Sequence, residues 1–315
     1  MTTLEMGQAL RVTFGETVTE LANTDPRIVM LDGDVGSSTR ADIFEEAHGD
    51  RFFQMGIAEQ NMLGVAAGMA SVGLIPFVST FACFAVARAL DTTRVIIAQP
   101  NLPVKITGGY AGLLAGMTGK THLMFDDVSI MRAMPNMTVF CPADDIETAQ
   151  GIRALVDDDG PAYIRLTRQA SPRLVGDDYR FDLSKSVVVR DGTDVTLISS
   201  GPQSVRVYEA AEMLAENGIN ALVLHVPTIK PIDVAGIVAA AEKTGFVITI
   251  EEHTIIGGLG GAVAEVLAEH APTPMRFHGI LDTYGESAPD DVLLEKYRLS
   301  SGQVAAVIEE HLHSR

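Results

Sequence analysis

Short apolar runs alternate with longer helical segments along most of this chain. The run "RIVMLDGD" (27–34) ends in turn residues, which predicts a buried strand. The stretch "GIAEQNMLGVAAGMASVG" (56–73) is rich in Ala, Gly, Met, Leu and Val and predicts a buried helix. The next apolar run, "GLIPFVST" (73–80), again has the length and β-branched content of a strand.

The same alternation continues through both halves of the chain. The first half continues with "FACFAVARAL" (81–90), "RVIIAQ" (94–99), "PVKITGG" (103–109), the strand "MTVFCPADD" (137–145), a helix from Asp144 to about Val156, and the strand "PAYIRL" (161–166). The second half gives strands at 194–201, 219–227, 246–253 and 275–280, and helices at 204–218, 233–245 and 257–270. This rhythm is typical of parallel sheets covered by helices on both faces.

A polar, irregular stretch separates the two halves. It reads "RQASPRLVGDDYRFDLSKS" (168–186) and shows neither the apolar periodicity of a helix nor that of a strand. We therefore expect an α/β protein with two doubly wound, mostly parallel-sheet domains, residues 1–172 and 190–315, joined by a linker over 173–189. A length of 315 residues suits two domains.

Composition narrows the class of protein. The formal net charge of -18 argues against nucleic acid or an anionic membrane as a partner. We find no apolar window long enough to span a membrane, and the first residues lack the apolar core of a secretory peptide. The two cysteines, Cys83 and Cys141, lie in apolar settings and favour a reducing compartment. We expect a cytoplasmic protein that acts on small molecules.

Turn-rich segments follow the predicted strands at 32–40, 79–84, 107–127 and 165–169. In open parallel sheets, ligand sites form at the carboxyl ends of strands, so these segments are the candidates for chemistry. The third is a long Gly-rich loop with many apolar residues. Loops of this length inside a domain are usually functional or disordered, and the apolar content favours function.

One acid stands out within the predicted helix at 56–73. Glu59 lies in the first turn of an apolar run, and burying an unpaired carboxylate costs several kcal/mol. An acid favoured by the helix dipole is one explanation. A carboxyl group that meets a ligand is the other.

Several blocks of the chain resemble the transketolase family. "FFQMGIAEQNMLGVAAGMASVGLIPFVSTF", "GKTH", "MRAMPNMTVFCPAD" and "IRLTRQ" are similar to the pyrimidine-binding domain of transketolase, and "EEHTIIGGLGGAVAEVL" is similar to its last domain. The family's diphosphate- and metal-binding motif, Gly-Asp-Gly followed by Asn, has no counterpart here. The resemblance therefore implies the carboxyl-terminal subunit of a split transketolase.

This resemblance implies a cofactor and a partner. The cofactor is thiamine diphosphate, shared with a separate amino-terminal subunit that binds Mg²⁺ or Ca²⁺. The implied assembly is an α2β2 heterotetramer in which both domains of this chain also self-associate. No metal ligands are expected in this chain. Glu59 matches the glutamate that hydrogen-bonds N1′ of the aminopyrimidine and favours its imino tautomer.

The resemblance also assigns roles around Glu59. Phe81 and Phe84 match aromatics that stack on the pyrimidine, although either could be ordinary core. Met55 and Ile57 are candidates for further cofactor contacts, with core packing an equal alternative. His122, in "GKTH", matches a histidine near the substrate carbonyl, where an imidazole can donate or shuttle a proton.

Three further residues match positions that contact a sugar phosphate. They are Arg11, Ser38 and Arg168, and arginine is well suited to bind phosphate bidentately. Arg168 is supported by "LTRQ", whereas Arg11 could instead be a solvated helix residue. Ser37 and Ser38 cannot be distinguished from the sequence.

The chain departs from the family pattern within the long loop. Tyr110 stands where transketolases usually carry His, and Met117-Thr118-Gly119 replaces Glu-Asp-Gly. Tyr110 and Thr118 are therefore predicted substrate contacts of altered, less acidic character. We expect a substrate other than the ordinary pentose phosphates.

Three functions remain open on the sequence. The first is ketol transfer between a sugar-phosphate-like ketose and an aldehyde, catalysed only together with the separate subunit. The second is the β subunit of a 2-oxo-acid dehydrogenase or an acyloin-forming enzyme. The third is a non-catalytic assembly subunit that has kept the fold.

Overall fold

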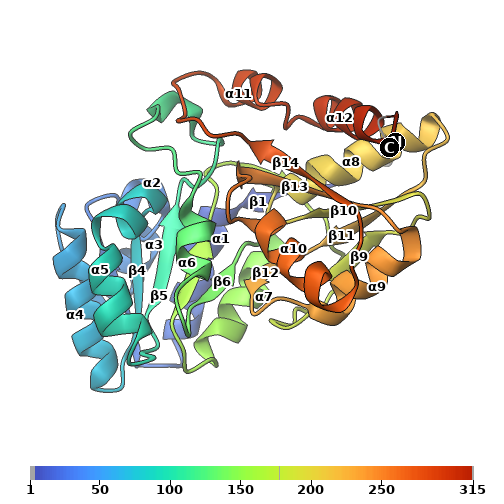
Figure 1. The fold of residues 1–315 in the computed structure, drawn as a ribbon. Helices are drawn as coiled ribbons and strands as arrows, with labels where there is room; N and C mark the ends of the chain where they lie inside the picture. The colour runs from blue at the N-terminus through green and yellow to red at the C-terminus, as the bar shows by residue number, and fades with distance from the viewer. Residues whose placement is uncertain (1–3, 177, 314–315) are drawn as a thin grey trace.

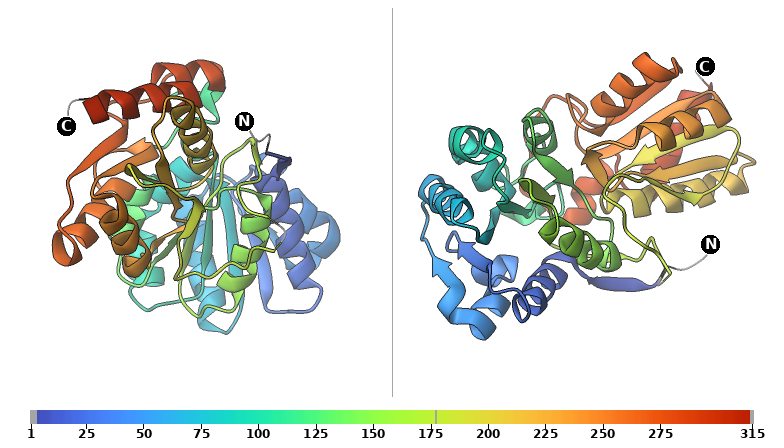
Figure 2. Two further views of the ribbon diagram at one scale, coloured as in Figure 1. Left: turned by 90° about the vertical axis from the view of Figure 1, so that its right-hand side faces the viewer. Right: turned by 90° about the horizontal axis from the view of Figure 1, so that it is seen from below.

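The computed structural model describes residues 4–176 and 178–313. Across these residues the strands form a seven-stranded sheet, a five-stranded sheet and a two-stranded ribbon. The first sheet carries most of the first half of the chain, and the second sheet carries most of the second half (Figure 1). Two views at right angles show these halves as two lobes in contact (Figure 2).

The first sheet has the strand order β12-β6-β7-β5-β4-β2-β3. Its strands are β2 Ile28–Asp32, β3 Phe52–Gln54, β4 Ile75–Phe81, β5 Lys105–Gly109, β6 Thr138–Phe140, β7 Ala162–Arg165 and β12 Thr228–Lys230. All neighbours are parallel except β12 and β6. The edge strand β12 comes from the second half of the chain, so the two lobes share a sheet.

The apolar runs of this sheet are continuous because both of its faces are buried. In β2, Ile28 and Met30 pack toward α1, α3 and α7, whereas Val29 and Leu31 pack toward the opposite face with α4. The helices of this half are α1 Leu10–Ala22, α2 Gly36–Thr39, α3 Asp42–His48, α4 Glu59–Ser71, α5 Leu90–Thr92, α6 Asp127–Arg132 and α7 Asp145–Val156.

The second sheet has the order β14-β13-β10-β11-β9. Its strands are β9 Val187–Arg190, β10 Val195–Ser199, β11 Ala221–His225, β13 Val247–Thr254 and β14 Met275–Ile280. Only β9 pairs antiparallel among the described strands of this sheet. Its helices are α8 Gln203–Glu216, α9 Val234–Thr244, α10 Leu259–His270, α11 Asp290–Lys296 and α12 Ser301–His313. The prediction of two mostly parallel α/β domains is confirmed.

The segment expected to be a linker packs closely against the first lobe. Backbone N–H groups of Leu174 and Val175 donate to Asp144 Oδ2, at 2.7 and 3.1 Å. The Phe181 ring meets Phe140 edge-on, with centroids 5.0 Å apart. Near its start, β8 Ala170–Pro172 pairs antiparallel with β1 Met6–Ala9. These contacts join the segment to both ends of the first lobe.

Two local differences from the sequence pattern concern the apolar run after β4. Residues Phe84–Arg88 and Thr93–Ala98 form π-helical segments around α5, and the second of these includes most of "RVIIAQ". π-helical turns are rare and are frequently found at functional sites. No described helix is long and apolar enough to cross a membrane.

Candidate functional site

The candidate residues gather at the carboxyl edge of the first sheet. Parallel pairing aligns Phe81 at the end of β4 with Gly109 at the end of β5. Gly108 pairs with Arg165 at the end of β7, so the segments that follow these strands leave the same edge. This is the edge at which open α/β sheets bind ligands.

Glu59 is buried and pairs with an arginine. It begins α4, and its residue is 4% exposed. Arg88 Nη1 donates to Glu59 Oε1 at 2.8 Å, and the arginine side chain is 47% exposed. The carboxylate in the apolar wall therefore has a charged partner at the rim of the site.

Arg88 also lies against Phe84, which stacks with Phe81; we call these two rings the aromatic wall. Its Cζ atom is 3.9 Å from the centroid of the Phe84 ring, a cation–π contact. Both residues belong to the π-helical segment Phe84–Arg88, which begins shortly after the end of β4. The wider π-helical turn thus places a guanidinium over a ring four residues earlier.

Tyr110 extends the aromatic wall from the next strand. Its ring stacks on Phe81 with centroids 4.2 Å apart and planes 17° apart. Tyr110 has a φ of 59°, which is uncommon for a residue with a side chain. A residue persists in this region only where surrounding contacts stabilise it. Here the stacking on Phe81 is such a contact.

His122 closes the aromatic cluster from the long loop. Its ring meets Phe84 edge-on at 5.2 Å and Phe81 at 6.1 Å between centroids. Nδ1 lies 2.9 Å from the Thr121 hydroxyl. This pairing orients the imidazole at the edge of the wall, so three predicted residues, Phe81, Phe84 and His122, form one cluster.

The predicted phosphate-binding residues also meet one another. Arg11 Nε donates to the carbonyl of Arg168 at 3.1 Å, and Arg11 Nη1 donates to the carbonyl of Ser38 at 2.7 Å. The Arg168 guanidinium lies 5.7 Å from the Tyr110 ring centroid. Contacts therefore connect the two arginines to the aromatic wall.

Asp32 positions the turn that carries Ser38. Its Oδ2 atom accepts backbone N–H bonds from Val35 and Gly36, each at 3.1 Å, and a bond from Gln54 at 2.8 Å. Asp32 is fully buried, and burial raises the pKa of its carboxyl above the usual value. The bonds hold the short helix α2 at the edge of the sheet, where its Ser38 carbonyl faces Arg11.

Three predicted residues stay outside this contact chain. Ile57 is 73% exposed, and Met55 is partly buried against the main core. Thr118 is exposed, and its hydroxyl donates to the carbonyl of Ala115 at 2.6 Å. None of the three has a described contact with the aromatic cluster or with Glu59. Met117 beside Thr118 is 67% exposed.

Arg88 was not among the residues predicted from the sequence. It is the one charged residue of "FACFAVARAL", and a lone charge in an apolar helical segment that follows a site strand is a usable signal. Its partner Glu59 lies 29 residues earlier, and no short-range pattern links the two.

The second lobe holds the long loop in place. The backbone N–H of Leu113 donates to Glu252 Oε1 at 2.6 Å, and that of Gly116 donates to Asp290 Oδ1 at 2.8 Å. Ser287 donates to the carbonyl of Met117 at 3.0 Å. The loop that carries His122 is thus bonded to β13, to α11 and to the segment before α11.

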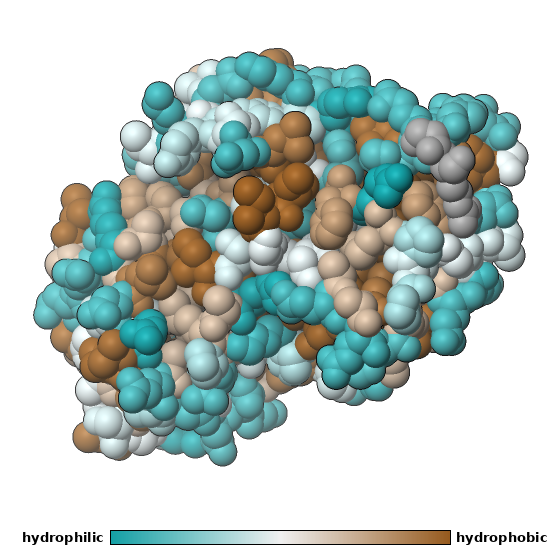
Figure 3. Space-filling model, in the orientation of Figure 1, coloured by the Kyte–Doolittle hydropathy of each residue, from teal (hydrophilic) through white to brown (hydrophobic). Residues whose placement is uncertain are grey.

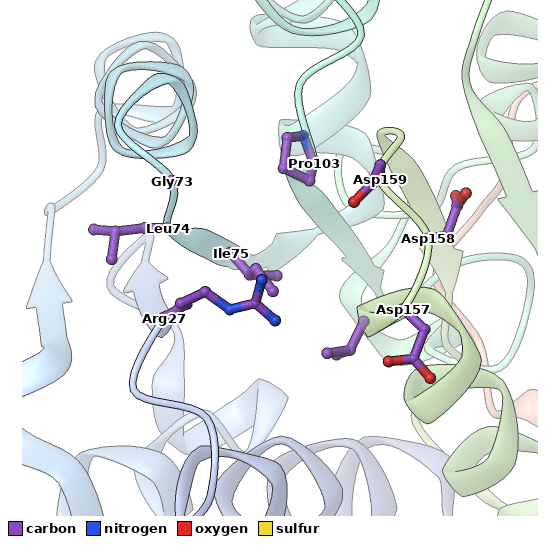
Figure 4. Close-up of a pocket in the computed structure, with 9 residues that line it drawn as sticks. Arg27, Gly73, Leu74, Ile75, Pro103, Asp157, Asp158 and Asp159 are labelled. Atoms are coloured by element: carbon purple, nitrogen blue, oxygen red, sulfur yellow. The ribbon is translucent and has the colours of Figure 1, made fainter.

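A cavity of about 300 Å³ lies at the opposite edge of the sheet. Its lining residues lie before or at the start of strands β2, β4, β5 and β7, with Arg27 on one side and Asp157 on the other (Figure 4). It belongs to the amino edge and has no part in the cluster described above. Within residues 4–176 and 178–313, no group of three or more His, Cys, Asp and Glu side chains could hold a metal ion.

Comparisons with known proteins agree with this architecture. The family model "Transketolase, pyrimidine binding domain" matches residues 6–173, and "Transketolase, C-terminal domain" matches residues 184–304. A 6-deoxy-6-sulfo-D-fructose transketolase subunit from Clostridium sp. (strain MSTE9) is 40% identical over 96% of this chain and 94% of its own length.

Two further proteins have the same extent. An apulose-4-phosphate transketolase subunit from Phocaeicola vulgatus is 42% identical over 87% of this chain and 88% of its own length. A solved structure of a split-gene transketolase, as an inactive β4 tetramer, is 43% identical and has a TM-score of 0.88 over 96% of this chain and 98% of its own. With both family models matched in order and these relatives aligned over nearly their full length, the chain belongs to the transketolase family.

Proposed function

We propose that this chain is the carboxyl-terminal subunit of a two-subunit, thiamine-diphosphate-dependent transketolase. The reaction is the transfer of a two-carbon ketol unit from a sugar-phosphate-like ketose to an aldehyde. The observation that carries the proposal is Glu59, a buried carboxylate at the edge of the aromatic wall formed by Phe81 and Phe84. The names of the three proteins compared above, two transketolase subunits and a split-gene transketolase, support it.

The side chains around Glu59 fit an aminopyrimidine. A flat heterocycle needs an aromatic face for stacking and a hydrogen-bonding partner at its edge. Phe84 offers a face, and the carboxylate of Glu59 is linked to it through Arg88, which contacts both. Thiamine diphosphate supplies, when bound, a nucleophilic thiazolium carbon. The part of Glu59 is to hold a proton at ring nitrogen N1′ in a site screened from water.

We assign His122 to proton transfer at the substrate carbonyl, and Arg11 and Arg168 to binding an anionic end of the substrate. His122, at the edge of the wall, donates a proton to the oxygen of the substrate carbonyl or takes one from it. Arg168 and Arg11, joined through the Arg168 carbonyl, present positive charge beyond Tyr110. An anionic end of the substrate is oriented by this charge.

The diphosphate and its Mg²⁺ or Ca²⁺ ion are assigned to a partner subunit. The described part of this chain offers no cluster of metal ligands, and the relatives are named as subunits. We propose an α2β2 heterotetramer in the cytoplasm. Apolar residues gather near the middle of one face, between the lobes, which suits a surface covered by another chain (Figure 3).

The substrate is proposed to be a sugar derivative other than the common pentose phosphates. Two relatives are named for 6-deoxy-6-sulfo-D-fructose and for apulose 4-phosphate, which are both anionic and unusual. Tyr110 gives this chain an aromatic contact where charge is usual in the family. An anionic, less hydroxylated or branched substrate suits that change.

Co-expression with a transketolase amino-terminal subunit tests the proposal. The complex is expected to bind thiamine diphosphate with Mg²⁺ and to transfer ketol units between a ketose phosphate and an aldehyde. A complex that decarboxylates 2-oxo acids without ketol transfer would favour a dehydrogenase or acyloin-forming subunit. A complex whose activity is unaffected when Glu59 and His122 are both replaced would favour an assembly role.

A further inference from the structure

The Arg88 guanidinium makes two contacts at the same time. It donates from Nη1 to the buried Glu59 carboxylate at 2.8 Å, and its Cζ atom lies 3.9 Å above the centre of the Phe84 ring. A guanidinium is planar, cationic and rich in N–H donors. The result is a flat donor that lies on an aromatic face and is hydrogen-bonded at its edge to a carboxylate.

An aminopyrimidine makes the same two demands of a protein. It stacks by its face and, when protonated on the ring nitrogen, donates an N–H to a carboxylate at its edge. On the proposed function of this chain, on which the inference rests, Glu59 and Phe84 serve those two needs. Arg88 therefore uses the carboxylate oxygen and the ring face that the cofactor requires.

We infer that Arg88 is an internal competitor for the aminopyrimidine site. In the chain without cofactor it neutralises Glu59 and covers Phe84, and it withdraws when the cofactor ring enters. It is a positioning residue, because it acts through Glu59 and touches no reacting atom. The chain thereby has a stable resting state in which its buried carboxylate is never left without a partner.

The burial of the two partners makes the exchange feasible. Glu59 is 4% exposed, so losing its partner without replacement would leave a buried, unpaired charge. Arg88 is 47% exposed at the rim, so its guanidinium can move into water without crossing packed core. An incoming ring N–H replaces the arginine N–H, and the hydrogen bond to Glu59 is exchanged.

The other aromatic residue assigned to the cofactor is also covered by a group of this chain. Phe81, the other aromatic assigned to the cofactor, is 7% exposed and lies under the Tyr110 ring at 4.2 Å. Each aromatic of the proposed ring site thus has an internal group stacked on it. Tyr110 keeps this position although its φ of 59° is unfavourable for a residue with a side chain.

Cofactor affinity in the reconstituted complex tests the inference. The dissociation constant of thiamine diphosphate, with Mg²⁺, is measured for the unaltered complex and for Arg88→Gln, Arg88→Lys and Arg153→Gln. We expect Arg88→Gln to bind about tenfold more tightly, the equivalent of about 1.4 kcal/mol. Arg88→Lys keeps the charge without the planar guanidinium, and its dissociation constant is expected to lie between those of Arg88→Gln and the unaltered complex. Arg153 forms an ion pair with Glu20 elsewhere, so its variant is the matched control and should bind as the unaltered complex does.

A double variant distinguishes competition from a general effect on folding. In the Glu59→Gln background, replacing Arg88 by Gln is expected to give a gain in affinity well below tenfold, because the contested carboxylate is gone and only the Phe84 face is freed. Equal or weaker binding by Arg88→Gln alone, measured where the unaltered complex binds the cofactor, overturns the inference and leaves the proposed function intact. Failure of the unaltered complex to bind thiamine diphosphate overturns both.

Discussion

Asp127 and Arg165 form a buried ion pair where the two lobes meet. Arg165 Nε lies 2.7 Å from Asp127 Oδ2, and Arg165 also donates to the carbonyl of Glu252 in β13 at 3.0 Å. Tyr163 adds a hydrogen bond to the same carboxylate at 2.7 Å. These bonds join α6 and β7 of the first lobe to β13 of the second sheet.

Asp127→Asn is expected to destabilise the chain by about 3–5 kcal/mol, because it leaves the buried Arg165 without a counter-charge. Chemical denaturation measures the loss. Asp25→Asn is the control: Asp25 pairs with the exposed Arg27, and such a pair contributes about 1 kcal/mol or less. Equal losses for the two variants would contradict the structural role given to Asp127.

The same pair predicts the acid sensitivity of folding. Burial by itself raises the pKa of Asp127, but the charges of Arg165 and His253, together with the hydrogen bonds from Arg165 and Tyr163, outweigh it and hold the pKa below the usual 3.8. A carboxyl group with a depressed pKa stabilises the fold above its unfolded pKa and loses that contribution as pH falls through the folded value. Unfolding free energies measured below pH 4 should therefore fall less steeply for Asp127→Asn than for the unaltered chain.

The isolated chain is expected to bind thiamine diphosphate weakly and to show no turnover. The charges that anchor the diphosphate and its metal ion are assigned to the partner, and these charges normally dominate cofactor binding. Calorimetric titration with cofactor and Mg²⁺ is the measurement, with the co-expressed complex as the positive control. Micromolar binding together with turnover by the single chain would refute the split assignment.

Glu59→Gln keeps the size of the side chain and removes its titratable proton. In the complex we expect folding to persist and exchange of the cofactor C2 proton to slow by about two orders of magnitude or more, as for loss of a general acid–base group. NMR in deuterated water follows the exchange. The control is Glu20→Gln, because Glu20 is exposed and pairs with Arg153. Near-normal exchange in Glu59→Gln would show that Glu59 has no catalytic role.

Substrate choice is predicted to depend on Tyr110 more than on Thr118. The Thr118 hydroxyl already donates to the Ala115 carbonyl, whereas Tyr110 lies on the aromatic wall beside Arg168. Competition assays should favour less hydroxylated or branched substrates over xylulose 5-phosphate with ribose 5-phosphate. Tyr110→His should shift the preference toward the pentose phosphates, and Tyr208→His, in α8, should leave it unchanged.

The ratio of rates with the two substrate classes decides whether the predicted specificity is correct. If the unaltered complex prefers the pentose phosphates by a hundredfold or more, about 2.7 kcal/mol in transition-state terms, the loop differences are neutral. Thr118→Asp separates the two positions further, since it should change the preference less than Tyr110→His.

Local signals were enough to predict several elements. The Ala-Asp-Asp sequence after β6 predicts a helix start at Asp144, and there the Asp144 side chain caps α7 by accepting from the Glu147 N–H at 2.9 Å. By contrast, β12 could not be predicted. It is three residues long, and its pairing with β6 arises from packing between segments that are far apart in the sequence.

In the site as well, residues within sequence motifs could be predicted, and contacts between distant segments could not. Phe81, Phe84, His122, Arg11 and Arg168 were predicted from motifs, and the structure brings them together. The Arg88–Glu59 pair was missed, because the lone charge of the apolar segment does not reveal a partner 29 residues away or the π-helical turn that brings the two together. The clamps on the long loop by Glu252 and Asp290 depend on contact between lobes, which periodicity within one lobe cannot reveal.

Those clamps have a consequence for how the protein diversifies. The loop bearing Tyr110 and His122 is bonded through its backbone to Glu252 and Asp290, two acids on a lobe that supplies none of the proposed catalytic groups. A substitution in that lobe can tilt the loop while every catalytic side chain is inherited unchanged. Changes in sugar preference can therefore arise from substitutions in the second lobe, with the catalytic side chains of the first lobe retained.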